Sequence, residues 1–414
     1  KMKILIFSST FPFGNNEVFL ENEIKYLKQK KNINYEIIPS KKEIKLNIKR
    51  KEFSYNNFLI KKKNKSKFSK FLNFIFGIKY SQCRKEIIRV LLNNPKALLY
   101  SAYSISNFSF YVDVFKNYFN NCENLENQII YTYWNTEITY ALQFLKPIYN
   151  YSLVSRIHGF DLYKEVRPYR YMPLKKYFLK NIDYLFPISK EGGQYLITNY
   201  KFNKSIIKHF YLGVKDNNYI SKQNKNNIFH IVSCSNLRRI KRIDKIIKLL
   251  DSISKIRKDI KFEWTHIGGG SLLSKYKSVS SEILSKVNFK FCGHLDNDEV
   301  YNFYKKNKID LFLNTSESEG VPVSIMEAMG FGIPIIAPDI GGVSEIISDN
   351  KNGFLLPKKF NNDDLVNAVI KILNSNKIDS IKKESRKLFE NKFTLESNYE
   401  SFYNFLKLNF KIRG

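Results

Sequence analysis

Short apolar runs alternate with amphipathic stretches along this chain of 414 residues, and the alternation occurs twice. In the first half, residues 3–9, 128–134, 152–160 and 183–189 read as strands, and residues 19–27 carry apolar side chains at helical spacing. Continuous apolar runs are typical of parallel strands that are covered on both faces. Strands separated by helical stretches indicate βαβ units, so we expect a doubly wound parallel sheet.

A polar, unpatterned segment at residues 213–230 follows, and it is typical of an interdomain linker. After this segment the alternation restarts, with strands expected at 229–235, 262–270, 287–293, 309–316 and 332–339.

The length of the chain suits two domains. In open parallel sheets, ligands bind outside the carboxyl ends of the strands, and two facing sheets form a cleft. We therefore expect an N-terminal domain at 1–218, a C-terminal domain at 219–395, and a terminal helix at 396–414 that packs back toward the first domain.

Charge and cysteine content narrow the classes of partner. The formal net charge of +31 favours anionic partners such as nucleic acid, acidic lipid or phosphorylated small molecules, although general enrichment in Lys, Asn and Ile explains it equally. Nucleic-acid binding is disfavoured because no recognition motif is present.

The four cysteines are far apart, which indicates neither zinc nor disulfides and fits a reduced, cytoplasmic protein. No apolar run approaches the ~20 residues needed to span a bilayer, so we expect any membrane contact to be peripheral.

The most informative passage is residues 316–347, SESEGVPVSIMEAMGFGIPIIAPDIGGVSEII, which follows an expected strand. Gly320 allows a tight turn, and Pro322 suits the first turn of a helix. The free N–H groups of that helix would face the cleft and suit a diphosphate. Glu319 precedes the helix, and Glu327 lies within it. Glutamates at a helix start also complement the helix dipole without any ligand.

A glycine pair, Gly341 and Gly342, follows the next expected strand and allows the backbone to approach a ligand closely. Together with the glutamates, the string resembles the hallmark of the retaining glycosyltransferases of the GT-B fold, in the GT4 or "group 1" family. That fold has two Rossmann-like domains that face each other across a cleft. The resemblance implies that Glu319 approaches the donor sugar and that Glu327 binds the nucleotide ribose, with Gly320, Val321 and Pro322 forming the donor-binding turn.

Residues 233–247 resemble the family segment in which an Arg and a Lys hold the diphosphate. Lys241 matches that Lys, whereas Asn236 stands where Arg is usual, and Arg238, Arg239 or Arg242 would supply the missing charge. A solvated basic face is the better interpretation for Arg239 and Arg242. The strand-end loop with Gly268 and Gly269 resembles the loop beside the nucleotide.

Four residues of the first half are candidates for the acceptor side. Family members with a similar His-Gly-x-Asp string place the His near the donor sugar and the attacking hydroxyl, which implies a catalytic role for His158. Asp161 either orients the acceptor or caps the following segment. Gly14 and Glu17 lie in a stretch that resembles the family loop over the donor and acceptor region.

Residues 60–85 mix lysines with apolar residues at helical spacing, namely Phe68, Phe71, Leu72, Ile75 and Ile78. The stretch Lys61–Lys85 suits an anionic membrane surface, and a helix packed on its own domain explains it equally.

The sequence thus predicts a retaining hexosyltransferase that uses a UDP- or GDP-linked sugar, without a metal or other cofactor, on a glycan or lipid-linked acceptor in bacterial surface polysaccharide or lipopolysaccharide synthesis. The alternatives are a glycosyltransferase that acts on a soluble or protein acceptor and a non-catalytic protein that binds a sugar nucleotide. We expect a cytoplasmic location, at the inner face of the cell membrane if the basic segment binds lipid.

Overall fold

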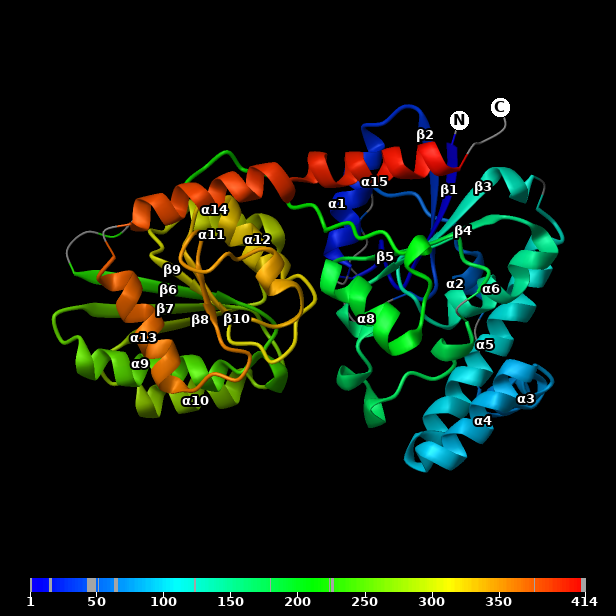
Figure 1. Cartoon of the computed structure of the whole chain (residues 1–414), viewed down its shortest axis with the longest axis horizontal. Helices are drawn as coiled ribbons and strands as arrows, with labels where there is room; N and C mark the ends of the chain where they lie inside the picture. The colour runs from blue at the N-terminus through cyan, green and yellow to red at the C-terminus, as the bar shows by residue number, and fades with distance from the viewer. Residues whose placement is uncertain are drawn as a thin grey trace. The chain divides into compact units, whose positions relative to one another are not determined.

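The structure is a computed structural model that describes residues 2–14, 17–42, 50, 52–62, 66–122, 124–178, 180–222, 224, 227–375 and 377–410. The chain forms two compact units, and Figure 1 shows the helices and strands of both. Unit 1 comprises Lys1–Tyr211 and Tyr399–Gly414, and unit 2 comprises Leu212–Asn398. Each unit contains one parallel sheet.

The sheet of unit 1 has the strand order β2-β1-β3-β4-β5, and every pairing is parallel. Four of these strands confirm the apolar runs expected from the sequence. The sequence did not predict β2, because Asn34 and Glu36 interrupt its apolar pattern on an edge strand that is only partly buried. The strands are β1 (Met2–Ser8), β2 (Ile33–Pro39), β3 (Gln128–Thr132), β4 (Ser152–Ile157) and β5 (Tyr184–Pro187).

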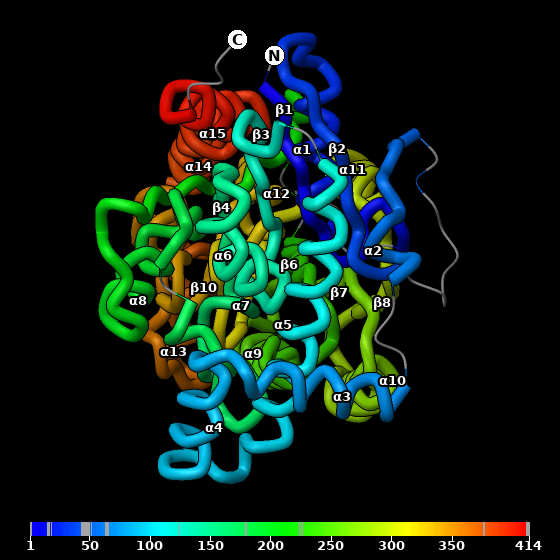
Figure 2. Tube along the Cα trace, turned by 90° about the vertical axis from the view of Figure 1, so that its right-hand side faces the viewer, coloured from blue at the N-terminus to red at the C-terminus, as the bar shows by residue number. Residues whose placement is uncertain are grey.

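The helices of unit 1 include a group between β2 and β3, in which α3 and α4 lie against the long helix α5 (Figures 1 and 2). Within the described ranges, no helix is both long and apolar enough to cross a bilayer. The helices are α1 (Val18–Lys28), α2 (Phe58–Lys61), α3 (Lys67–Ile78), α4 (Ser81–Asn93), α5 (Leu98–Phe119), α6 (Glu137–Tyr149), α7 (Gly159–Leu162) and α8 (Lys190–Tyr200).

The last helix, α15 (Leu395–Asn409), contributes its residues from Tyr399 onward to unit 1. The hydroxyl of Tyr403 donates to Oε1 of Glu23 at 2.7 Å, and Nη2 of Arg156 lies 3.5 Å from Oε2 of the same carboxylate. Both charged side chains are fully buried. Since breaking a buried ion pair is strongly destabilising, this cluster ties the end of the chain to unit 1.

The sheet of unit 2 has the order β11-β10-β9-β6-β7-β8, again entirely parallel. The strand expected at 309–316 is shorter than predicted, because the side chain of Asn314 accepts a hydrogen bond from the amide of Ser316 and turns the chain away. The strands are β6 (Ile228–Cys234), β7 (Lys261–Ile267), β8 (Asn288–Gly293), β9 (Leu311–Leu313), β10 (Ile335–Pro338) and β11 (Phe354–Leu356).

The helices of unit 2 cover both faces of its sheet (Figure 1). One face carries α9 (Ile243–Ile256), α10 (Leu273–Ile283) and α13 (Asn362–Leu373), and the other carries α11 (Asn297–Lys306), α12 (Val323–Gly330) and α14 (Ile378–Lys392).

The segment expected to be a linker packs against unit 2 over much of its length. The amide of Val214 donates to the carbonyl of Phe393 at 2.8 Å, and Asp216 forms an ion pair with Arg386 at 2.7 Å. The segment looked like a linker because its described residues before β6 form no helix or strand and many of them remain partly exposed, whereas its last three residues belong to β6.

Candidate functional site

The strand order of unit 2 brings together two loops that lie far apart in the sequence. Because β6 pairs with β9, the segments that follow these strands meet at one edge of the sheet. The amide of Glu317 donates to the carbonyl of Ile240 at 2.8 Å. The hydroxyl of Thr315 donates to the carbonyls of Lys241 and Arg242 at 3.1 and 3.0 Å. The two loops therefore form a single surface.

Lys241 and Glu319 form an ion pair on this surface, with 2.6 Å between Nζ and Oε1. The same oxygen accepts a hydrogen bond from Nδ2 of Asn314 at 3.2 Å. The side chains of Lys241 and Glu319 are only 23% and 10% exposed. Two residues that the sequence singled out separately thus lie in contact, and they offer a cation and a carboxylate side by side.

A turn at residues 319–322 leads from Glu319 into α12 and is held by the next loop along the chain. The amide of Gly342 donates to the carbonyl of Gly320 at 2.7 Å. Gly341 has a φ of 51°, and a Cβ placed there would lie 2.0 Å from the carbonyl oxygen of Glu319. The sequence led us to expect that this glycine pair approaches a ligand. In the structure, its close approach is to the backbone of the turn.

Helix α12 begins one residue later than the sequence indicated. Pro322 has a ψ of 112° and precedes the helix, instead of occupying its first turn. The helix spans Val323–Gly330, and among the described residues no side chain caps its start. The amide of Ile325 donates to the carbonyl of Pro322 at 3.1 Å, whereas the amides of Val323 and Ser324 have no hydrogen-bond partner among the described residues. An anion at this end would be stabilised by those groups and by the helix dipole.

Glu327 lies one turn into α12 and is 7% exposed. Oε1 accepts a weak hydrogen bond from the hydroxyl of Tyr301 at 3.4 Å. Burial raises the pKa of the Glu327 carboxyl to about 7, and the bond from Tyr301 opposes that rise. A buried carboxylate with one weak donor can accept further hydrogen bonds.

The glycine loop after β7 packs against the segment that follows β6. The amide of Leu237 donates to the carbonyl of Gly269 at 2.8 Å. Gly268 has a φ of 139°, and a Cβ there would lie 1.9 Å from the carbonyl oxygen of Ser235. A Cβ at Gly270 would lie 2.4 Å from Oδ1 of Asn236. Asn236 and Arg238 are both exposed beside this loop.

His266 supports the same loops, a role that was not predicted from the sequence. Its Nδ1 lies 2.9 Å from the hydroxyl of Ser233, and its Nε2 lies 3.0 Å from the carbonyl of Ser235. Burial lowers the pKa of His266 to about 4, so the ring is neutral at physiological pH. The sequence signal that could have identified His266 is its position at the end of an apolar strand. The same signal applies to Asn314, which follows β9.

In unit 1, β1 pairs with β3, so the loops that follow these two strands lie at the same edge of the sheet, as the loops after β6 and β9 do in unit 2. The carboxylate of Glu17 accepts hydrogen bonds from the amides of Ser9, Thr10 and Phe11 at 2.8, 2.6 and 2.7 Å. It also accepts one from Nε1 of Trp134 at 2.6 Å. Both oxygens of Glu17 therefore hold the surrounding loops of its own chain.

Gly14 lies in the same loop, has a φ of 65°, and is buried. A left-handed backbone at this point favours glycine. Its neighbours 15 and 16 lie outside the described residues.

His158 precedes α7 and packs between the rings of Tyr133 and Trp134, with centroid distances of 4.9 and 4.5 Å. It is 5% exposed, and neither ring nitrogen has a hydrogen-bond partner among the described residues. Burial, and to a lesser extent the charge of Arg156, holds the pKa of His158 well below its usual value. Buried polar atoms in proteins are nearly always paired, so a neutral imidazole with two free nitrogens is a candidate for ligand contact.

Asp161 is the cap that one of the two interpretations predicted. One carboxylate oxygen accepts from the amide of His158 at 2.6 Å, and the other accepts from the amide of Asn135 at 2.6 Å. The buried ammonium of Lys175 donates to Oδ1 of Asn135 at 2.9 Å and to the carbonyl of Asp161. Asp161 therefore fixes the loop that carries His158.

Residues 214–392 match the family model of glycosyl transferases group 1, which covers most of unit 2. An uncharacterized glycosyltransferase of Methanocaldococcus jannaschii is 34% identical over 149 residues, which are 36% of this chain and 40% of that protein.

Two bacterial proteins match over shorter segments. The GtfA subunit of a UDP-N-acetylglucosamine–peptide N-acetylglucosaminyltransferase from Streptococcus agalactiae is 30% identical over 132 residues, 32% of this chain and 25% of that protein. The O-antigen biosynthesis glycosyltransferase WbnH of Escherichia coli is 40% identical over 84 residues, 20% of this chain and 22% of that protein. The chain spans less than half the length of each of these three relatives.

Solved structures with low sequence identity share the fold. The lipopolysaccharide outer core galactosyltransferase WaaB, in its apo form, has a TM-score of 0.70 at 17% identity over 98% of this chain and 99% of that one. HepE of Anabaena in complex with UDP-glucose has a TM-score of 0.63 at 16% identity over 99% of this chain and 100% of that one. The chain therefore has the two-domain GT-B fold of glycosyltransferases, and its second unit carries the sequence pattern of the group 1 family.

Proposed function

We propose that this chain is a retaining glycosyltransferase of the GT4 family that transfers a hexose from a nucleotide sugar. The observation that carries the proposal is the Lys241–Glu319 ion pair at the turn before α12. It places a cation and a carboxylate beside a helix start at which two amides, those of Val323 and Ser324, have no partner among the described residues and can bind an anion. The match of unit 2 to the group 1 family supports the same conclusion.

In this proposal each part of the donor has its own partner in unit 2. The N–H groups at the start of α12, the turn Gly320–Pro322 and Lys241 bind the diphosphate. Glu327 accepts hydrogen bonds from the ribose hydroxyls, for which its single weak bond to Tyr301 leaves capacity. Glu319 contacts the sugar. The remaining contacts to the nucleotide come from Asn236, Arg238, Gly268 and Gly269.

The reaction breaks the bond between the anomeric carbon and the diphosphate oxygen. The acceptor hydroxyl attacks that carbon from the face the diphosphate leaves, which retains the anomeric configuration. The hydroxyl proton passes to the departing diphosphate, so no carboxylate forms a covalent bond. The contribution of Lys241 and of the α12 amides is to stabilise the negative charge that develops on the diphosphate. The proposal includes no metal, because the one Asp-x-Asp string of the sequence, Asp296 to Asp298, lies at the start of α11, where Asp296 caps the helix by accepting from the amide of Glu299 at 2.9 Å.

On the acceptor side we assign His158 to contact with the sugar and the attacking hydroxyl. Its two unpaired, buried nitrogens support this role. Asp161, Glu17 and Gly14 act indirectly, since their hydrogen bonds and backbone conformations shape the loops around it.

For the acceptor itself, we propose a glycan or lipid-linked glycan of bacterial surface polysaccharide or lipopolysaccharide, with a UDP- or GDP-linked donor. The relatives named for O-antigen synthesis and for synthesis of the polysaccharide amylovoran support this choice. A protein acceptor is the second candidate, because the GtfA subunits named as peptide N-acetylglucosaminyltransferases also match part of this chain.

Peripheral attachment to an anionic bilayer, from the cytoplasmic side, is part of the proposal. Helix α3 turns its apolar stripe outward: Phe68 and Phe71 are 70% and 59% exposed. On its inner side, Gly77 packs tightly against Ile105 of α5. Exposed aromatic residues flanked by lysines suit the interface of an anionic membrane. Lys63 and Lys65 of this basic segment lie outside the described residues.

Two assays test the proposal. A thermal-shift screen against UDP- and GDP-linked sugars should identify the donor. With that donor, Glu327→Ala should weaken binding, whereas Glu319→Ala should chiefly lower turnover. Unchanged donor binding and unchanged turnover in both variants would contradict the site assignment.

Sedimentation with anionic vesicles tests the peripheral attachment to the membrane. The double substitution Phe68→Ser with Phe71→Ser should abolish that attachment.

A further inference from the structure

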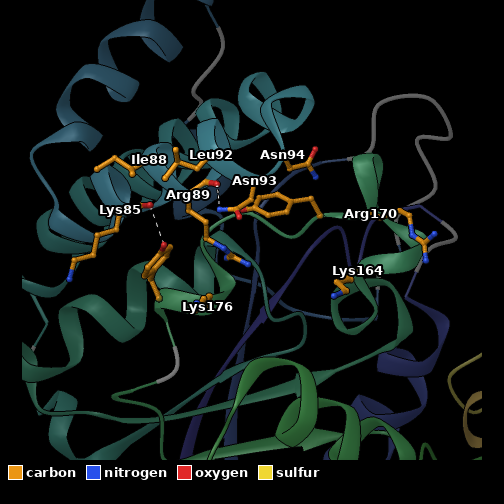
Figure 3. Close-up of a pocket in the computed structure, with 11 residues that line it drawn as sticks. Lys85, Ile88, Arg89, Leu92, Asn93, Asn94, Lys164, Arg170 and Lys176 are labelled. Carbon is orange, nitrogen blue, oxygen red and sulfur yellow. Dashed lines mark hydrogen bonds between the residues drawn. The ribbon is translucent and has the colours of Figure 1, made fainter.

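A basic cavity of about 650 Å³ lies in unit 1, and of its lining residues only Lys85 belongs to a segment assigned above. Helix α4 forms one wall, and residues 164–177 form the other (Figure 3). Its volume falls within the range of small-molecule sites. Five of the lining side chains are cationic and none is a carboxylate, the five being Lys85, Arg89, Lys164, Arg170 and Lys176.

None of these five cations forms an ion pair with another described residue. The nearby carboxylate of Glu86 is buried and accepts a hydrogen bond from the hydroxyl of Tyr171 at 2.8 Å. Like charges around one cavity repel each other, and an anion inside it removes that repulsion. The charge pattern therefore indicates an anionic ligand with more than one oxygen.

The two walls are joined before any ligand arrives. Besides the bond from Tyr171 to Glu86 on α4, Tyr177 donates to the carbonyl of Lys85 at 3.1 Å. Asn94 donates to the carbonyl of Tyr169 at 3.2 Å. A cavity held by three such bonds lowers the entropic cost of binding.

The backbone beside the cavity is strained. Tyr169 and Arg170 have φ values of 57° and 51°, so two consecutive residues with side chains occupy the left-handed region. Such residues cost of order 1–3 kcal/mol each and cluster at ligand sites. Arg170 is one of the residues that line the cavity (Figure 3).

The rim of the cavity is apolar. Ile88 and Leu92 of α4 line it and are exposed to solvent, and Leu91 and Leu99 are exposed nearby in the sequence. They belong to the same helical group as the outward-facing stripe of α3. A ligand that satisfies both features carries phosphate oxygens for the cations and a hydrocarbon chain for the rim.

We propose that this cavity binds the phosphate or diphosphate of a lipid, and that the lipid is the carrier of the acceptor. The inference rests on the proposed function and specifies its acceptor as lipid-phosphate-linked. Lys164 lies six residues after His158, so their Cα atoms are at most about 20 Å apart. A phosphate held here and a sugar hydroxyl near His158 are thus compatible with one short lipid-linked glycan.

The test measures binding of a long-chain polyprenyl phosphate in nonionic detergent micelles to the full chain. Lys164→Glu with Arg170→Glu should weaken binding at least tenfold. The matched control is Lys31→Glu with Lys204→Glu, which reverses two exposed charges of unit 1 outside the cavity and should change binding less than twofold. Equal effects of the two pairs would overturn the proposal.

Two further probes identify the source of the phosphate. Inorganic pyrophosphate should bind at least tenfold more weakly than the polyprenyl phosphate, and equal binding would refute the need for a lipid. Vesicles of phosphatidylcholine and phosphatidylglycerol should lose no more affinity in the cavity variant than in the control. A selective loss of vesicle affinity in the cavity variant would assign the cavity to bulk lipid headgroups and overturn the acceptor assignment.

Titration of UDP into the unaltered protein tests the proposed function separately. If UDP did not bind while the polyprenyl phosphate still bound, only the proposed function would be contradicted.

Discussion

Gly341→Ala should move the turn that carries Glu319, and the structure gives the size of the effect. A Cβ at Gly341 would lie 2.0 Å from the carbonyl oxygen of Glu319, whereas contacts of this kind need more than about 3 Å. The turn must therefore shift by about 1 Å. The left-handed φ of 51° adds about 1–2 kcal/mol of backbone strain.

The matched control is Gly293→Ala. Gly293 also has a left-handed φ, 73°, but a Cβ there would meet no atom within 4 Å. The control therefore carries the strain without the displacement. Urea unfolding should show that Gly341→Ala loses about 1–3 kcal/mol more than the control.

Calorimetric titration with UDP should show at least a tenfold loss of affinity in Gly341→Ala and less than a threefold loss in Gly293→Ala. A misplacement of about 1 Å in a binding group is enough for this loss. If both variants bound UDP equally well, the position of the turn would not matter for the nucleotide, and the reasoning would be refuted.

Three other predictions concern buried titratable groups. Burial raises the pKa of the Glu327 carboxyl to about 7, so its ionisation should lower the free energy of unfolding by up to about 3 kcal/mol as the pH rises from about 4.5 to 7. Urea unfolding at pH 5 and pH 8 should show this loss in the wild type and not in Glu327→Gln. Ribose hydroxyls favour the ionised carboxylate, so the rise in UDP affinity between pH 6 and pH 8 should be larger in the wild type than in Glu327→Gln, which keeps only the contribution of the UDP phosphate that ionises in this range. His158→Phe should change the free energy of unfolding by less than about 1 kcal/mol, because both ring nitrogens lack partners, yet lower the transfer rate at least about tenfold. Lys175→Met should cost about 3 kcal/mol of stability, since it removes the buried partner of Asn135 and Asp161, and a loss below about 1 kcal/mol would contradict that role.

The sequence located the two segments of the candidate donor site, but it did not predict that they lie in contact. Lys241 and Glu319 each follow an apolar strand, and that placement could be predicted. The pairing of β6 with β9 brings them together, and strand order depends on how whole βαβ units pack. A contact between residues so far apart is therefore invisible to local patterns.

Residue type alone misled at positions where polar groups serve their own chain. Glu17 and Gly341 have the chemistry of ligand-binding residues, but Glu17 accepts hydrogen bonds from backbone amides of its own loop and Gly341 packs closely against the backbone of Glu319. The direction of those backbone groups follows from loop conformation, which sequence patterns do not define. For the same reason, the basic cavity between α4 and residues 164–177 had no sequence signal, because its cations come from two separate segments.

The central claim is that Lys241 and the turn at Glu319 bind a sugar nucleotide. The most direct measurement is calorimetric titration of UDP into the wild type, Lys241→Met and Lys248→Met. Lys248 is an exposed residue of α9, so its variant controls for the loss of one positive charge. We predict at least tenfold weaker binding for Lys241→Met and unchanged binding for Lys248→Met. Equal affinities in all three proteins would contradict the claim.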